Sequence, residues 1–145
     1  MNIDSLRSII NDCELDEEKI CVNSMKLHDV VLFIYKNFSY KMLKSITAVD
    51  LGDDIELIYD LFSPEDNESV LLSVKVQYEA ESIVDIYGSA SADENEIYDM
   101  FGINFIGNED LKRLYMPENW EGYPLKKDYI MDDKRLVWND NIDNA

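Results

Sequence analysis

Three strand-like segments follow one another in the middle of the chain, and they constrain the fold more than any other feature. They cover residues 45–51, 53–63 and 69–80, and they are rich in β-branched and aromatic residues. Short turn signals separate them: Gly52–Asp54 between the first two, and Pro64–Asn67 between the last two. Connections this short favour antiparallel hairpins. The third segment sets Leu72, Val74, Val76 and Tyr78 against polar neighbours, which predicts one buried face and one solvated face.

Other segments predict helices and a further strand. Residues 3–10 place Ile3, Leu6, Ile9 and Ile10 at helical spacing. A strand is expected around Ile20 and Val22, and a helix over the apolar stretch 28–38. The fold class is therefore α+β, with a mixed or largely antiparallel sheet of about four strands covered by two to three helices.

A further helix is predicted over residues 92–101. Ser91 and Glu94 stand at capping-box spacing, and Gly102 is placed to end the helix in a left-handed conformation. Glu94 falls inside the apolar arc of this helix, so it should either cap the helix or meet a cation. The opposite side, with Asn95, Glu96 and Asp99, is expected to be solvated.

Beyond Asn104 the sequence predicts little regular structure. We divide the chain into an α+β part, residues 1–110, and an extended C-terminal arm with a flexible tail, residues 111–145, within a single domain. The arm carries basic residues and aromatic side chains of the kind that dominate contact energy at protein interfaces. Two readings stay open: the arm folds back on its own domain, or it reaches an acidic partner. We favour the partner, with self-packing over residues 111–117 only. The side chains concerned are Lys112, Arg113, Trp120, Tyr123, Lys126, Lys127 and Tyr129.

Composition excludes several classes of function. The chain has 31 acidic and 13 basic residues, a net charge of −18, which disfavours nucleic-acid binding. The longest apolar run, Val30–Tyr35, is too short to span a membrane, and the first ten residues are not expected to act as a secretory signal. Cys13, Cys21 and His28 are the only cysteines and the only histidine, too few for a structural zinc or an iron–sulfur cluster. We therefore expect no cofactor on this chain.

Convincing catalytic constellations are also lacking. No nucleotide-binding, P-loop or C-x-x-C motif occurs. Glu96 and Asp99, three residues apart, have the spacing for acid–base work or a divalent cation, but a solvated helix face explains them better in so acidic a chain. His28 is expected to cap or pack, and Lys126 and Lys127 beside Asp128 to form surface ion pairs.

Residues 94–129, from ENEIYDMFG to PLKKDY, resemble the signature region of the C-type small subunit of NADH-quinone oxidoreductase, a peripheral subunit of complex I. The same family includes the equivalent subunit of complex I-related membrane-bound hydrogenases. The family pattern matches here at Glu94, Glu96, Asp99, Phe101, Gly102, Ile103, Asp110, Leu111, Lys112, Arg113, Glu121, Gly122, Pro124, Leu125, Lys127, Asp128 and Tyr129. The sequence departs from it at Ala92, where Trp is common, at Asn95, where Arg is usual, at Asn108-Glu109, where His-Pro is usual, and at Tyr123, where His is usual. These departures suggest a divergent branch of the hydrogenase type.

The resemblance implies a peripheral subunit on the cytoplasmic face of the membrane, without a cofactor of its own. It would pack against the hydrogenase-like large subunit, which is of the D type, and neighbouring subunits that carry iron–sulfur clusters. The partner interface it implies comprises Glu94, Glu96, Asp99, Lys112, Arg113, Trp120, Tyr123, Lys126, Lys127 and Tyr129. Two rivals remain: an acidic interaction protein unrelated to electron transfer, such as a nucleic-acid mimic, and a stand-alone carboxylate enzyme using Glu94, Glu96 and Asp99.

Overall fold

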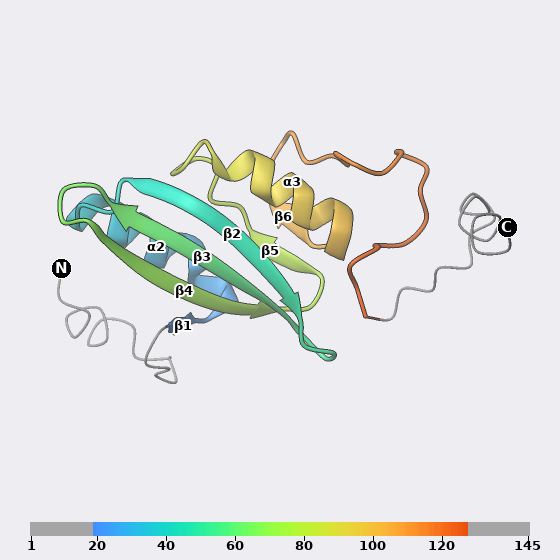
Figure 1. The fold of residues 1–145 in the computed structure, drawn as a ribbon, viewed down its shortest axis with the longest axis horizontal. Helices are drawn as coiled ribbons and strands as arrows, with labels where there is room; N and C mark the ends of the chain where they lie inside the picture. Colours follow the sequence, from blue (N-terminus) through green and yellow to red (C-terminus); the bar gives the residue numbers. More distant parts are fainter. Residues whose placement is uncertain (1–18, 128–145) are drawn as a thin grey trace, which may run out of the picture.

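The computed structural model describes residues 19–127. The helix predicted over residues 3–10 and the interface residue Tyr129 lie outside the described residues. Within the described range the chain forms a four-stranded sheet, a two-stranded sheet and two α-helices (Figure 1).

The main sheet is mixed, as predicted. Its strand order is β1-β4-β3-β2, with β1 at Ile20–Val22, β4 at Glu68–Val76, β3 at Ile55–Ser63 and β2 at Met42–Asp50. The two hairpins β2–β3 and β3–β4 are antiparallel, and β1 adds to β4 in parallel. A register shift between Leu43 and Ser45 interrupts the β2–β3 ladder. The strands and the helix over the apolar stretch confirm the predicted α+β class.

Strand β3 shows most clearly how the sheet sorts its side chains. Ile55, Leu57, Tyr59 and Leu61 are buried, whereas the residues between them are half-buried, because successive side chains point to opposite faces. The predicted alternation of the third segment holds at Leu72, Val74 and Val76 but is wrong at Tyr78, which is 73% exposed. Strand β4 ends at Val76, so Tyr78 no longer lies on the sheet.

One face of the sheet is covered by α2 (Leu27–Asn37), which lies behind the strands in Figure 1 and follows the short 3-10 helix η1 (Ser24–Lys26). Leu27, Val31 and Ile34 are buried, at the spacing that one face of a helix requires. The helix ends where the backbone N–H of Phe38 donates to the carbonyl of Ile34.

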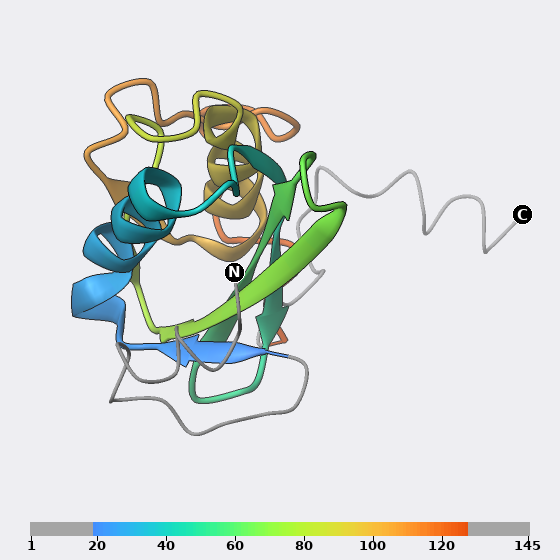
Figure 2. The ribbon, with the colours of Figure 1, turned by 90° about the vertical axis from the view of Figure 1, so that its left-hand side faces the viewer.

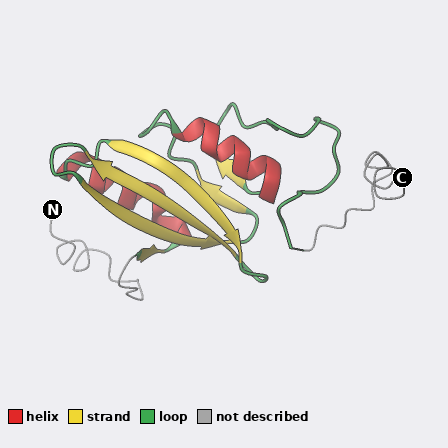
Figure 3. Ribbon diagram, viewed as in Figure 1, coloured by secondary structure: helices red, strands yellow, loops and turns green. Residues whose placement is uncertain are grey.

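The second helix, α3 (Ala90–Phe101), packs beside β2, as Figures 2 and 3 show. The carboxylate of Asp93 accepts a hydrogen bond from the backbone N–H of Ile46 on the outer strand, so α3 shields part of that sheet edge. Short strands β5 (Glu79–Glu81) and β6 (Asn104–Ile106) pair in parallel on the side of α3. Sequence reasoning missed this pair because three-residue strands give no periodic signal. No helix within residues 19–127 is long and apolar enough to cross a membrane.

Candidate functional site

The signature region forms one connected structure built on α3. Its helix ends at Gly102, which has φ of 77° and donates its N–H to the carbonyl of Tyr98. The left-handed cap predicted from sequence is thus confirmed. A Cβ atom on Gly102 would lie 2.6 Å from the ring of Tyr123, so glycine is required here for space as well as for backbone conformation.

The carboxylate of Asp99 fixes the chain that returns from β6. Asp99 is fully buried, and its Oδ2 accepts backbone N–H groups from Leu114, Tyr115 and Met116 at 3.2, 2.7 and 3.1 Å. Its Oδ1 takes a hydrogen bond of 3.1 Å from the guanidinium of Arg113. One carboxylate therefore satisfies several donors of a segment that has no secondary structure of its own.

The rest of this segment also packs against α3 and against itself. We call residues 111–127 the strap. The Arg113 guanidinium lies 5.0 Å from the centre of the Tyr123 ring and donates to the carbonyl of Gly122 at 3.0 Å. Leu125 donates its N–H to the carbonyl of Met100 on α3, and Trp120 is only 9% exposed.

The strap ends beside Asp50, the last residue of β2. The N–H of Lys127 donates to Oδ2 of Asp50 at 2.8 Å, and this bond, together with the N–H of Gly52, holds the pKa of Asp50 below its usual range. The expectation that self-packing stops at residue 117 is therefore wrong. Apolar periodicity does not detect this packing, because its hydrogen bonds involve polar groups; four of them join strap N–H groups to the carboxylates of Asp99 and Asp50.

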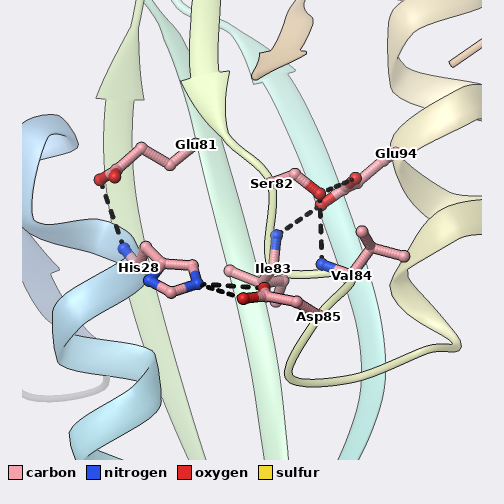
Figure 4. Close-up of polar contacts among 7 residues, drawn as sticks. All are labelled: His28, Glu81, Ser82, Ile83, Val84, Asp85 and Glu94. Atoms are coloured by element: carbon pink, nitrogen blue, oxygen red, sulfur yellow. Dashed lines mark hydrogen bonds and ion pairs between the residues drawn. The ribbon is translucent and has the colours of Figure 1, made fainter. Parts of the chain in front are cut away.

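Glu94 is held inside the molecule by neutral donors. It is fully buried and accepts hydrogen bonds from the Ser82 hydroxyl at 2.8 Å, the Ile83 N–H at 2.9 Å and the Asn108 amide at 2.9 Å; Figure 4 draws the first two. Burial raises the pKa of Glu94, and these hydrogen bonds oppose the rise.

The predicted capping box is wrong, and so is the alternative that Glu94 meets a cation. The helix begins two residues earlier than the box requires, with Ser89 as its N-cap residue, which makes no side-chain cap bond. Glu94 therefore sits in the second turn and points inward, where the Ser82 segment and Asn108 supply donors.

The opposite side of α3 is not the solvated face that was predicted. Asn95 is 5% exposed and accepts the N–H of Lys112 on its Oδ1 at 3.1 Å, and Asp99 is buried as described. Only Glu96 of the three is exposed. The strap covers this side of the helix, which the helical period of α3 alone cannot reveal.

The residues assigned to the partner interface consequently divide by exposure. Glu96, Lys112 and Lys127 are exposed; Arg113, Tyr123 and Lys126 are half-buried; and Glu94, Asp99 and Trp120 lie in the interior. The first two groups are accessible from outside the domain. Of the interior residues, Asp99 binds the strap and Trp120 belongs to it, whereas Glu94 binds residues outside the strap. The interface assignment itself stays a prediction.

Within residues 19–127, no group of three or more His, Cys, Asp or Glu side chains is placed to hold a metal ion. His28 pairs through Nε2 with the Asp85 carboxylate at 2.9 Å and joins α2 to the loop before α3 (Figure 4). An open depression of about 380 Å³ beside Asp50 is lined by both acidic residues, Asp53 and Asp54, and basic ones, Lys126 and Lys127, a mixed charge that favours no class of ion.

Comparison with solved structures identifies the fold. With a TM-score of 0.78, the chain superposes on a chain from the structure titled the membrane-bound sulfane sulfur reductase, an archaeal respiratory membrane complex. That match covers 99% of this chain and 89% of the other at 22% identity, so it shows a shared α+β fold.

Sequence comparison shows the family. The family described as "Respiratory-chain NADH dehydrogenase, 30 Kd subunit" matches residues 20–135. The C-type NADH-quinone oxidoreductase subunit of Geobacter sulfurreducens is 31% identical over 121 residues, which are 78% of this chain and 74% of that one. The C/D-type NADH-quinone oxidoreductase subunit of Phocaeicola vulgatus is 34% identical over 77% of this chain, which spans only 22% of that protein's length. The chain belongs to the family of 30 kDa subunits of respiratory-chain NADH dehydrogenase.

Proposed function

We propose that the chain is a cofactor-free peripheral subunit of a complex I-like redox complex, either an NADH-quinone oxidoreductase or an energy-converting hydrogenase. In this role it packs against the hydrogenase-like large subunit and helps to build the quinone or hydrogen module. The observation that carries the proposal is the family match over residues 20–135, which spans the sheet, α3 and the strap together.

The nature of the relatives supports a large subunit as the direct neighbour. In the protein of Phocaeicola vulgatus, one polypeptide carries the C and D designations together, and this chain corresponds to 22% of it. Two subunits joined in one chain are held at high effective concentration, which favours direct contact between them. We therefore assign the large subunit of the D type as the partner of this chain, and subunits with iron–sulfur clusters as its further neighbours.

The outer side of the strap is the contact surface we assign to this partner. Leu114, Tyr115 and Leu125 are 44%, 67% and 56% exposed, although the backbone beside each of them is bonded to α3. Apolar side chains presented on a fixed backbone lose little conformational freedom when a partner covers them. The strap is thus prepared for binding rather than folded only for its own domain.

Membrane attachment follows from assembly on this proposal. The chain would sit on the cytoplasmic side and be held there by its partners, because its net charge of −18 disfavours direct contact with anionic lipid. Electron transfer would run through groups carried by the neighbouring subunits.

The test is recovery of the complex with a tagged chain. The chain, produced in its native organism, is purified from mildly solubilised membranes, and the co-purifying proteins are identified by mass spectrometry. We expect a large subunit of the D type in stoichiometric amount. Recovery of the chain alone, or of a basic partner in a salt-sensitive complex without redox subunits, would overturn the proposal in favour of an acidic interaction module.

One pair of variants makes this experiment specific for the strap. Tyr115→Asp places a charge on its outer side, and Met25→Asp places the same charge on η1, where Met25 is 83% exposed. Loss of an interface tyrosine commonly costs about 2 kcal/mol, or roughly thirtyfold in affinity. We expect Tyr115→Asp to lower recovery of the large subunit and Met25→Asp to leave it unchanged. Equal recovery with both variants would exclude the strap as the contact.

A further inference from the structure

The face of the main sheet that points away from α2 is open. Figure 1 shows this face toward the viewer, with α2 behind it, and none of the described helices lies over it. It carries apolar side chains from three neighbouring strands, of which Met42 and Val49 are 49% and 41% exposed. The others are half-buried: Ile58, Phe62 and Leu71. This is an apolar surface without a partner in the described part of the chain. We call it the open face.

The chain enters the described region over this same face. Glu56 alternates on β3 with the buried residues Ile55 and Leu57, so its side chain points to the open face. The Lys19 ammonium lies 3.2 Å from Oε1 of Glu56, with side-chain exposures of 27% and 15%. The side chain of Lys19 therefore reaches the open face immediately before β1 begins.

Residues 1–18 include apolar side chains that can pack against the apolar residues of the open face. Ile3, Leu6, Ile9 and Ile10 are spaced for one side of a helix, and a helix of eight to ten residues is about 12–15 Å long. Four strands about 4.8 Å apart present a surface about 14 Å wide. Residues 11–18 can reach about 26 Å when extended, which is enough to return across the sheet.

The charge on the open face is mixed: Lys44 and Lys75 can meet the acidic residues 14–18, which read ELDEE, and the same face also carries Glu56 and Asp60. Lys75 lies opposite Glu56 in the strand register, and the Lys44 ammonium lies 4.2 Å from the centre of the Phe62 ring. We propose that residues 1–18 dock on the open face, with the apolar side of a helix over residues 3–10 against Ile58, Phe62 and Leu71. This proposal is independent of the partner assignment made above.

The rate of thiol labelling measures directly whether residues 1–18 shield the open face from solvent. The probe is Ile58→Cys, at the centre of the open face, in a full-length chain whose natural cysteines are both replaced by serine. Ile9→Asp adds a charge on the apolar side of the predicted helix, and Ser8→Asp adds the same charge on its opposite side. We expect slow labelling of the probe, a several-fold increase with Ile9→Asp, and no change with Ser8→Asp. Equal rates in all three proteins would overturn the proposal.

A cross-link tests the same geometry without relying on a destabilising charge. In the cysteine-free chain, Leu6→Cys is combined with Leu71→Cys, and Ser8→Cys with Leu71→Cys serves as the control. A disulfide needs Cα atoms within about 7 Å, so the first pair should oxidise readily and the second should not. Protection of the probe that grows with protein concentration would point to a second copy of the chain. Protection that arises only within an assembled complex would point to a partner subunit. Either result would overturn the proposal.

Discussion

Asp99 shows how a single carboxylate can organise a segment that has no regular structure. Its two oxygens accept bonds from the Arg113 guanidinium and from three consecutive backbone N–H groups. Each of those donors would otherwise lose its hydration without a replacement when the strap packs on α3. The charge of the carboxylate makes these bonds stronger than bonds to a neutral acceptor.

Asp99→Asn should therefore loosen the strap. The change keeps the shape of the side chain but leaves the half-buried Arg113 without its charged partner, and breaking a buried pair costs about 3–5 kcal/mol. We expect a lower midpoint in urea unfolding and faster proteolysis within residues 111–127. Glu96→Gln, one turn away and exposed, is the matched control and should behave as the parent. Identical protection of the strap in both variants would contradict this role for Asp99.

Gly102 is the second residue on which the strap depends. Gly102→Ala puts an alanine at φ of 77° and a Cβ 2.6 Å from the Tyr123 ring, so it should cost more than the roughly 1 kcal/mol of a left-handed alanine alone. Gly88→Ala is the control, because a Cβ there meets nothing within 4 Å. We expect only the first variant to lower the thermal midpoint. Asn95, which the sequence presents as a solvent-facing control, is unsuitable because it is buried.

At the scale of elements, Glu94 joins three segments that are distant in the chain. It sits on α3 and binds the segment after β5, through Ser82 and Ile83, and the loop after β6, through Asn108. Among the described residues, the charge of Asp85 opposes ionisation of this carboxylate, and none of the groups that shift its pKa is a cation. The contribution of Glu94 to the stability of the fold therefore depends on pH.

The direction of that dependence follows from the pKa of Glu94. Burial raises it in the folded protein, so the folded state holds the proton more tightly than the unfolded chain does. This contribution to the free energy of unfolding is complete below the unfolded value of about 4.3 and is lost as the pH rises through the folded pKa.

Glu94→Gln removes this titration, so its free energy of unfolding should fall less than that of the parent as the pH rises above about 4. Urea unfolding at several pH values gives the free energy of unfolding of both proteins. In the difference between the two proteins, the contributions of the other acidic groups cancel. Parallel curves for parent and variant would contradict the assignment.

An element could be predicted from the sequence when its residue pattern is local and extends over several positions. The hairpins, α2, α3 and the cap at Gly102 were predictable because each rests on a local period or on a residue with a special conformation. Strands β5 and β6 were not, since pairing over three residues depends on contacts between segments far apart in sequence. The roles of Glu94, Asn95 and Asp99 were missed for the same reason: their donors come from residues 82–83 and 108–116, and a helical wheel contains no information about them.

At the scale of the whole molecule, the strap lies where charge favours it. Residues 77–110 contain nine acidic residues and no basic one, whereas the strap carries Lys112, Arg113, Lys126 and Lys127 against two acidic residues. Folding the strap over α3 brings opposite charges together in a chain of net charge −18 and reduces its self-repulsion. The contact is therefore a favourable internal one even before a partner is considered.

Two shortened chains separate the contribution of the strap from that of the rest of the arm. One ends at Lys127 and the other at Pro117, so both lack residues 128–145 and differ only in residues 118–127. The shorter chain loses the buried Trp120, the Tyr123 ring over Gly102 and the bond from Lys127 to Asp50. Loss of a buried tryptophan side chain alone costs about 3–5 kcal/mol.

The shorter chain should still fold, because its hydrophobic core lies between Ile20 and Phe105. Its thermal midpoint, followed by circular dichroism, should nevertheless fall by about 10 °C or more relative to the chain that ends at Lys127. The two chains should also differ in assembly, the shorter one binding the large subunit more weakly. Coincident melting curves would mean that residues 118–127 rest on the domain without stabilising it. A shorter chain that is unfolded at room temperature would mean that the strap belongs to the core itself, and either result would contradict the division made here.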